Sequence, residues 1–288
     1  MRLRTKNAWI GFCLILPLVL GCLVFYGAPF VLVGFYSVVR GNGAARQFVG
    51  LENYEKLLSN PVFRLAIGNT IGFLAVGLFL ILMLSYAIAL LLRNPAQRSK
   101  LLQSVVMMPY VMPVVGTVVL VDILFAEAGL WSKLYTALGL PLQDWLQGNS
   151  AFWVTVGLYL WKNTGYSVVI LLSGLVTIPK EHYDAAELDG ATALQKFWHI
   201  TVPQMWYSVF IAGVFSLINA FKCFREIFLI GGEAPSESLY MLQHFINNSF
   251  QKLSYGKMAA ASMLLTALLC LLFGLCYRQV MRKEAYRE

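Results

Sequence analysis

The chain has 288 residues, of which 59% are hydrophobic and only 12% are charged, and its formal net charge is +8. Soluble domains carry about 25% charged residues, so this composition excludes an ordinary soluble protein. A basic chain can bind nucleic acid, but here the Lys and Arg residues flank apolar runs, so membrane topology explains them and no nucleic-acid partner is expected. The five cysteines lie in or beside apolar runs without CxxC spacing, which argues against a disulfide framework or a metal site.

Six long runs with few or no charges predict six transmembrane helices, because about 20 apolar residues are needed to cross a bilayer. The first run follows three basic residues but is too long for a cleaved signal sequence, so we expect an uncleaved anchor. The fourth is broken only by Lys162, and its helix is expected over about 152–175. The runs are 7–39, 65–92, 101–121, 145–179, 197–221 and 258–277. We therefore expect an all-α membrane protein in contact with membrane lipid.

The predicted external loops and the third span carry local signals. Apolar residues recur at helical spacing over 51–58, which predicts a short interfacial helix. The loop 127–150 contains Trp131, Tyr135 and Trp145, typical of an aromatic belt at a membrane interface. Pro109 and Pro113 predict a kink in the third span, which would either line a cavity or be a purely structural bend.

The distribution of basic residues predicts the orientation. Twelve Lys and Arg residues fall on the side that holds both termini and the segment 178–203, against seven on the other side. Since basic loops stay in the cytoplasm, we expect a multi-pass protein of the plasma (cytoplasmic) membrane with both termini cytoplasmic. The expected parts are 1–63, an N-terminal helix with its external loop; 64–279, a five-helix core; and 280–288, a cytoplasmic tail.

The segment 178–203 is the most polar stretch between two spans. Pro179 suits the first turn of a helix, and Gly190 suits a helix end that needs positive φ. Thr192 followed by Gln195 predicts a capping box that opens a second helix, and Pro203 is expected to limit the continuation of that helix. The segment is thus predicted to be two short helices joined at a glycine elbow.

The charged side chains of this elbow are mostly acidic, which limits the partners it can bind. An amphipathic elbow lying on lipid headgroups, or a helix-turn-helix reader of DNA, would need basic residues instead. Ala185 and Ala186 leave a small-residue face, and Phe197 supplies an aromatic group for a hydrophobic groove. We therefore predict a docking surface for a soluble partner. Its acids are Glu181, Asp184, Glu187 and Asp189.

The elbow resembles the EAA loop of ABC importer permeases, whose form is roughly EAAxxDGAxxxxxFxxIxxP. Asp184 stands where the family usually has Glu, which keeps the carboxylate but shortens its reach. Other stretches resemble the carbohydrate-uptake branch, of the maltose-permease type, so the resemblance covers nearly the whole chain; they are 48–58, 68–76, 107–113, 161–166, 221–228 and 255–265. The residues expected to couple to the ATPase are Glu181, Asp184, Ala185, Ala186, Asp189, Gly190, Phe197, Ile200 and Pro203.

This resemblance implies the partners and the activity. It implies the ABC importer permease fold of six or more helices, paired with a second, non-identical permease, two cytoplasmic ATPase subunits and an external solute-binding protein. The solute would be a sugar, in particular an oligosaccharide, moved by alternating access that is driven through the EAA loop. The chain has no G-x-x-x-x-G-K-[ST] phosphate loop, so ATP and Mg are expected on the ATPase subunits, with no cofactor and no catalytic residue on this chain.

Two stripes of polar residues at helical spacing mark a candidate substrate path. Hydroxyl, amide and aromatic groups inside a membrane are functional candidates, although they also hold neighbouring helices together by hydrogen bonds. Lys162 would pair with an acidic or phosphorylated solute or extend to an interface, while Arg225 and Glu226 are expected to pair with neighbours rather than bind a ligand. The stripes are Tyr159, Lys162, Asn163 and Tyr166 in the fourth span, and Ser216, Asn219 and Cys223 in the fifth.

Other functional classes make different demands on the sequence. The main alternative is a self-sufficient secondary transporter of a small polar solute, which would often show an inverted repeat with broken helices, and no such repeat is evident. A membrane enzyme would need converging acid, base or metal-binding residues, which an isolated Lys162 does not supply. A membrane scaffold would leave the two polar stripes without a purpose.

Overall fold

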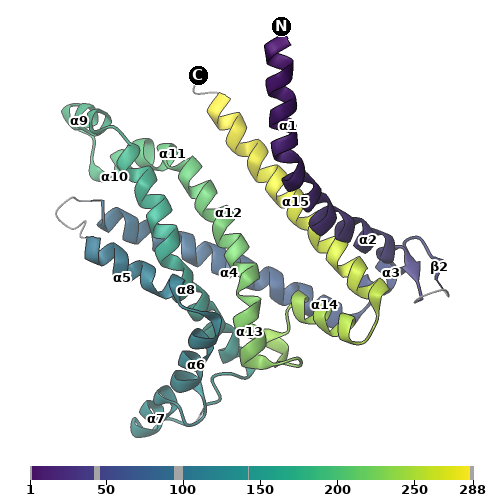
Figure 1. The fold of residues 1–288 in the computed structure, drawn as a ribbon. Helices are drawn as coiled ribbons and strands as arrows, with labels where there is room; N and C mark the ends of the chain where they lie inside the picture. The colour runs from purple at the N-terminus through teal and green to yellow at the C-terminus, as the bar shows by residue number, and fades with distance from the viewer. Residues whose placement is uncertain (1, 42–45, 94–99, 142, 286–288) are drawn as a thin grey trace. The chain divides into compact units, whose positions relative to one another are not determined.

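The structure, a computed structural model, describes residues 2–41, 46–93, 100–141 and 143–285. Side chains are described over 10–41, 46–93, 103–141, 143–274 and 277–278. The described chain is built almost entirely of helices (Figure 1), as the apolar composition predicts. It divides into two compact units: Met1–Arg64 with Phe245–Cys270, and Leu65–His244 with Leu271–Glu288.

The first unit contains the N-terminal helices and a small cap made of two short strands and a helix. Strands β1 (Val39–Arg40) and β2 (Gln47–Phe48) pair antiparallel, with Val39 opposite Phe48. The buried Asn53 side chain donates hydrogen bonds of 2.9 Å to the carbonyls of Ser37 and Val39, which fixes the end of α2 against α3. The helices of this unit are α1 (Arg2–Cys22), α2 (Ala28–Ser37) and α3 (Glu52–Leu58), with the starts of α4 (Pro61–Leu91) and α15 (Tyr255–Ala285) and most of α14 (Leu242–Gln251).

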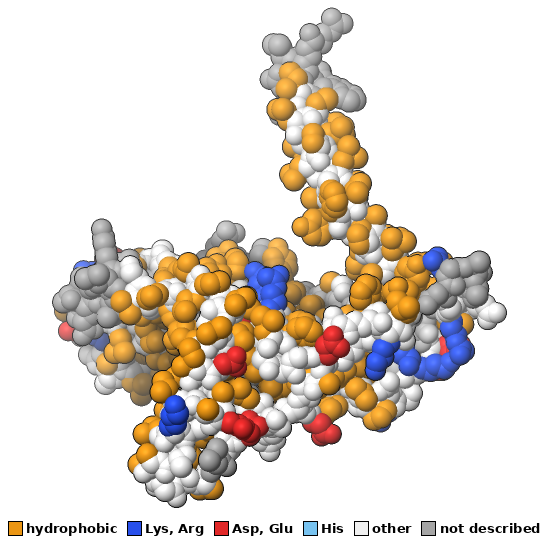
Figure 2. Space-filling view, turned by 60° about the horizontal axis from the view of Figure 1, so that its bottom comes forward, with side chains coloured by type: hydrophobic (Ala, Val, Ile, Leu, Met, Phe, Trp, Pro, Cys, Tyr) orange, Lys and Arg blue, Asp and Glu red, His pale blue; other side chains and the backbone are white. Residues whose placement is uncertain are grey.

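The short helix predicted over 51–58 is confirmed as α3, which begins one residue later. A π-helical turn, Leu23–Gly27, joins α1 to α2, so the first apolar run forms one continuous helical segment. In the 18-residue window that qualifies Ile10–Ser37 as a candidate span, no residue is buried inside the chain. Figure 2 shows apolar side chains over much of the face of the protein in view.

The second unit surrounds the long helix α8 (Gly148–Thr177). Pro179 ends this helix, because a proline ring pushes the preceding residue out of the helical region, and Ile178 accordingly has an extended ψ of 120°. Helices α5 and α12 both pack on α8. The remaining helices of the unit are α5 (Lys100–Val111), α6 (Val114–Phe125), α7 (Leu130–Ala137), α9 (Lys180–Leu188), α10 (Ala193–Lys196), α11 (Val202–Gln204), α12 (Trp206–Lys222) and α13 (Phe224–Gly231).

Glycines allow these helices to approach closely. A Cβ atom added to Gly165 of α8 would lie 2.0 Å from the carbonyl oxygen of Val106 in α5, and one added to Gly174 would lie 2.1 Å from the Ser208 hydroxyl in α12. Small residues at such crossings are how membrane helices gain packing contacts, since lipid provides no hydrophobic drive for their association. The backbone of α8 is therefore held between two neighbours at these two glycines.

Among the described residues, five helices are long and apolar enough to cross a membrane. They are Ile10–Ser37, Pro61–Leu91, Val114–Ala137, Trp206–Gly231 and Tyr255–Gly274. The fourth predicted span, 152–175, lies in α8, which does not meet this criterion because polar residues such as Asn163 and Ser167 dilute its apolar character. These two side chains are buried inside the unit. The count of six spans therefore stays a prediction.

The third predicted span, 101–121, is not one helix. It divides at Met112–Pro113 into α5 and α6, and the candidate span in this region instead begins at Val114 and runs to Ala137. The break follows from Pro113, which has no N–H to donate and stands with an extended ψ of 149° before α6. The bend predicted from Pro109 and Pro113 is therefore present as an interruption between two helices.

Candidate functional site

The elbow predicted over 178–203 forms from local capping interactions. Helix α9 begins at Lys180 and ends in a Schellman motif, in which the N–H of Ala191 donates to the carbonyl of Ala186 at 2.9 Å. The N–H of Gly190 donates to the carbonyl of Glu187 at 3.0 Å, and Gly190 has a φ of +75°. A left-handed residue at this point is strongly favoured to be glycine, so the prediction for Gly190 is confirmed.

The second half of the elbow starts at the predicted capping box. Thr192 Oγ1 accepts from the Gln195 N–H at 3.3 Å, and Gln195 Oε1 accepts from the Thr192 N–H at 2.8 Å. Pro203 was expected to limit this helix, and that expectation is wrong. A π-helical turn, Phe197–Thr201, widens the helix just before Pro203, so helical backbone continues through α11 to Gln204, and α12 follows at Trp206.

Side-chain contacts tie the two halves of the elbow together. The Tyr183 and Thr201 hydroxyls are 2.9 Å apart, and the Arg93 guanidinium lies 4.1 Å from the centre of the Tyr183 ring. Lys196 Nζ donates to Glu187 Oε2 at 2.9 Å, across the glycine turn. The elbow therefore has a defined shape and is attached to the end of α4.

The predicted coupling residues divide between two faces. Phe197 packs edge-on against Tyr86 at 5.9 Å between ring centres, and Ile200 packs on the buried cluster that contains Leu175 and Met205. Ala186, like these two, is half-buried. The exposed members of the set are Glu181, Asp184, Ala185, Asp189, Gly190 and Pro203.

Large apolar side chains accompany the exposed acids. Leu188 is 91% exposed, Leu194 68% and Trp198 58%. Large apolar side chains that are exposed in an isolated chain often mark a surface that binds another protein. The acids and these three side chains together form an exposed surface of mixed chemistry, which we call the elbow surface. Its role in ATPase coupling stays a prediction.

The two predicted polar stripes meet, because α12 packs along α8, but they serve two different purposes. At one level Tyr159 is fully buried and its hydroxyl donates to the Ser216 carbonyl at 2.8 Å. The Ser216 hydroxyl lies 3.0 Å from that of Ser167. These groups hydrogen-bond across the helix pair, so at Tyr159 and Ser216 the helix-packing interpretation holds.

One turn further along, the stripes line a small polar pocket. This pocket, which we call the α8–α13 pocket, has a volume of about 170 Å³. From the stripes it takes Lys162, Asn163, Asn219 and Cys223, and it adds Tyr110 and Val114 at the break between α5 and α6. Tyr166 does not line the pocket but stacks on Tyr110, with ring centres 4.9 Å apart and an angle of 15° between the ring planes.

Sequence reasoning missed three charged residues of this pocket. Lys222, Arg225 and Glu226 also line it, whereas the sequence predicts only pairing with neighbours for Arg225 and Glu226. Their spacing in the sequence could have identified Lys222 and Glu226. Together with Cys223, they continue the fifth-span stripe from Asn219 at intervals of three and four residues.

The charges of the α8–α13 pocket are only partly compensated. Lys162 Nζ donates to Glu226 Oε1 at 2.5 Å, and the two side chains are 13% and 4% exposed. The expected pairing of Glu226 with a neighbour is thereby confirmed, and Lys162 is compensated within the chain. The same expectation for Arg225 is wrong, since among the described residues Arg225 forms no ion pair. Burying an unpaired charge is costly, so this pair is what allows both residues to lie between the helices.

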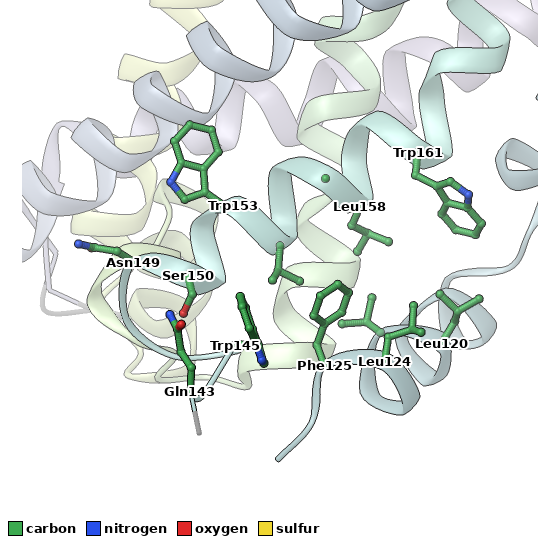
Figure 3. Close-up of a pocket in the computed structure, with 13 residues that line it drawn as sticks. Leu120, Leu124, Phe125, Gln143, Trp145, Asn149, Ser150, Trp153, Leu158 and Trp161 are labelled. Carbon is green, nitrogen blue, oxygen red and sulfur yellow. The ribbon is translucent and has the colours of Figure 1, made fainter. Parts of the chain in front are cut away.

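A larger groove lies on the other side of α8 and is almost entirely apolar. It has a volume of about 840 Å³, and Trp145, Trp153 and Trp161 line it together with leucines of α6 (Figure 3). Its polar lining groups, Gln143, Asn149 and Ser150, gather at one end. Apolar walls of this kind suit lipid or another helix, so the smaller α8–α13 pocket is the better candidate for a hydroxylated solute.

Comparison with known proteins identifies the fold and the family. Residues 81–284 match the family described as binding-protein-dependent transport system inner membrane component. A trehalose/maltose transport system permease protein of Thermococcus litoralis is 29% identical over 285 residues, covering 98% of this chain and 96% of that protein. A probable ABC transporter permease of Bacillus subtilis is 31% identical, covering 82% of each chain.

A solved structure has the same fold. It is a chain of a bacterial ABC transporter involved in the import of the acidic polysaccharide alginate, with a TM-score of 0.82 and 21% identity, covering 98% of this chain and 99% of that one. The resemblance inferred from the elbow is therefore confirmed at the level of family and fold.

Proposed function

We propose that this chain, which belongs to the family of binding-protein-dependent transport system inner membrane components, is the transmembrane permease subunit of an ATP-driven importer of a sugar. The observation that carries the proposal is the match over 81–284, which includes both the elbow and the α8–α13 pocket. The chain itself is a multi-pass membrane protein and supplies a path rather than a reaction.

The sugar class rests on the chemistry of the pocket and on the relatives. Amide, ammonium and carboxylate groups converge between helices in the α8–α13 pocket, and they match the hydroxyl groups of a saccharide. The stacked Tyr110 and Tyr166 rings add an aromatic face nearby. A relative is named for trehalose and maltose, and a structural neighbour imports a polysaccharide, which favours an oligosaccharide here.

Coupling to ATP hydrolysis is proposed to enter through the elbow surface. Leu188, Leu194 and Trp198 would enter an apolar groove of a cytoplasmic ATPase subunit, while the acids around Asp184 would meet basic residues at its rim. Closure of two such subunits on ATP and Mg would push α9, and the contacts of Tyr183 and Ile200 would pass that movement to α12 and the end of α4.

The remaining parts of the assembly follow from the same proposal. A second, non-identical permease would complete the path, an external binding protein would deliver the sugar, and both termini would lie in the cytoplasm. The 64–279 core would carry the path, with 1–63 as an added helix and external cap. ATP and Mg would bind only to the ATPase subunits.

Reconstitution tests this function. The chain, co-purified with its partner permease and ATPase subunits, should take up labelled saccharide into proteoliposomes only when ATP and the binding protein are both supplied. The rival, a secondary transporter, would show uptake by the purified chain alone without ATP. Uptake of that kind, or none by the whole assembly across a panel of saccharides, would overturn the proposal.

A further inference from the structure

We infer that the α8–α13 pocket binds a negatively charged group, a carboxylate, sulfonate or phosphate, on a hydroxylated solute. This inference rests on the proposed function and narrows its substrate class from saccharides in general to acidic ones. It combines two independent observations, an excess of positive charge and an unpaired buried carboxylate oxygen.

The excess of charge comes from the residues that line the pocket. Of the described residues that line it, Lys162, Lys222 and Arg225 are cationic and Glu226 alone is anionic, which leaves a net charge of +2. Glu226 is already paired with Lys162, and among the described residues Lys222 and Arg225 have no ion-pair partner. Both lie inside the candidate span Trp206–Gly231.

Cations within a membrane span are expensive unless they face water or a counter-charge. Neutral hydroxyl groups would leave Lys222 and Arg225 uncompensated, whereas an anionic group would form charge-assisted hydrogen bonds with them. Arg225 in particular offers a planar fork of donors that fits carboxylate, sulfonate or phosphate oxygens.

The second observation concerns Glu226. Its Oε1 accepts from Lys162, while its Oε2 is buried without a hydrogen-bond partner, and the residue is only 3% exposed. A carboxylate oxygen can only accept hydrogen bonds, so its missing partner is a donor. A solute hydroxyl supplies that donor, whereas a simple inorganic anion without hydrogens would be repelled at this point.

The size of the pocket limits what enters it. A volume of 170 Å³ lies below the 300–1,000 Å³ of pockets that enclose drug-sized ligands and corresponds to about six water molecules of liquid. The pocket therefore fits one charged sugar residue or one phosphorylated polyol, and a longer chain would pass through it one residue at a time.

A pair of probes that differ only in charge tests the inference. Trigalacturonate and its fully methyl-esterified form would be titrated by saturation-transfer NMR against the co-purified assembly in phosphatidylcholine nanodiscs, without the binding protein. We expect the acid to bind about tenfold more tightly than the ester, as charge-assisted hydrogen bonds imply. Lys222→Gln with Arg225→Gln should remove that preference.

A matched control removes two cations elsewhere on the chain. Lys133 and Lys252 are exposed and do not line the pocket, so Lys133→Gln with Lys252→Gln should keep the preference. Replacing the buried pair together, Lys162→Met with Glu226→Gln, tests the hydroxyl contact without leaving one charge unpaired. This variant should lower the affinity for the acid and for the ester by the same severalfold factor, so the ratio of the two affinities should not change.

Three results would overturn the inference. Equal affinity for the acid and the ester would do so, as would a preference that survives Lys222→Gln with Arg225→Gln. Loss of the preference when phosphatidylglycerol is added to the nanodiscs would assign the pocket to a lipid headgroup instead. In each case ATP-driven uptake of a neutral saccharide by the same assembly would leave the proposed function intact, so the two failures are distinguishable.

Discussion

The elbow surface and the α8–α13 pocket both contain several charged residues, although the chain has few of them. The charges of the elbow surface are exposed, whereas the central charges of the pocket are buried and paired. At the elbow, Asp184 and Asp189 are exposed, and the backbone is fixed by caps made within a dozen residues. In the pocket, Lys162 and Glu226 lie 64 residues apart in the sequence, on two different helices, and are buried against each other. Loss of a charge at the elbow should therefore change coupling, whereas loss of one in the pocket should first change stability.

Coupling at the elbow should respond most strongly to substitution. Asp184→Lys and Gly190→Pro should each abolish uptake and solute-stimulated ATPase activity of the reconstituted assembly, while the chain still inserts. A proline has φ near −65° and cannot adopt the +75° of Gly190, and a lysine reverses the charge of the docking surface.

Matched substitutions sharpen this test. Asp184→Glu keeps the carboxylate, and Gly190→Asn keeps a residue that tolerates left-handed backbone, so both should retain most of the uptake. Full activity in Asp184→Lys and in Gly190→Pro would show that this surface does not carry the coupling.

In the pocket the largest effect should be on folding. Glu226→Leu leaves Lys162 buried without a counter-charge, so the free energy of unfolding should fall by about 3–5 kcal/mol, measured by denaturant titration in mixed micelles. Lys162→Met with Glu226→Leu should recover most of that loss. If the single and double variants are equally unstable, the pair is not what compensates Lys162.

A third buried polar group, His244, should make the stability of the protein depend on pH. It is fully buried between aromatic rings, its Nδ1 accepts from the Met241 N–H at 3.2 Å, and burial lowers its pKa from 6.5 to about 4. The unfolded chain therefore binds more protons between pH 6.5 and 4, so stability is full above pH 6.5 and falls as the pH drops through this window. Thermal unfolding in detergent measures the loss. A His244→Leu variant should lack this component, and an unchanged pH profile in it would assign the loss to other groups.

A weaker effect is expected at the helix cap within the elbow. Thr192→Ala removes the side-chain oxygen that accepts from the Gln195 N–H and should cost about 1 kcal/mol of local helix stability. Hydrogen exchange at the amide of Gln195 measures it, since local opening exposes this group, and Thr192→Ser should retain protection. Equal protection in Thr192→Ala would show that the cap is not needed once α9 is in place.

Much of the elbow could be predicted from the sequence because its structure is local. The capping box at Thr192 and the left-handed Gly190 depend on residues within one helical turn, and both are confirmed. The failure at Pro203 is also instructive. A proline by itself predicts the end of a helix, but here the π-helical turn Phe197–Thr201 accommodates Pro203. No residue of that turn indicates a π-helix from the sequence.

The pocket was only half predictable because it depends on which helices meet. The stripes on α8 and α12 identified Lys162 and Asn219, but the sequence did not distinguish Tyr159 and Ser216, which join the helices, from residues that face open space. Nor did it pair Lys162 with Glu226, because the two come together only when α13 follows α12 beside α8.

The amino-acid sequence is enough to identify a helical membrane protein, to locate its polar elbow and to show which family it resembles, because composition, helical periodicity and capping act over short stretches of chain. Which polar residues are compensated, and which remain open to a solute, depends on how the helices pack. Charge pairing and burial depend on distances between helices, and residues far apart in the chain acquire those distances only when the helices pack.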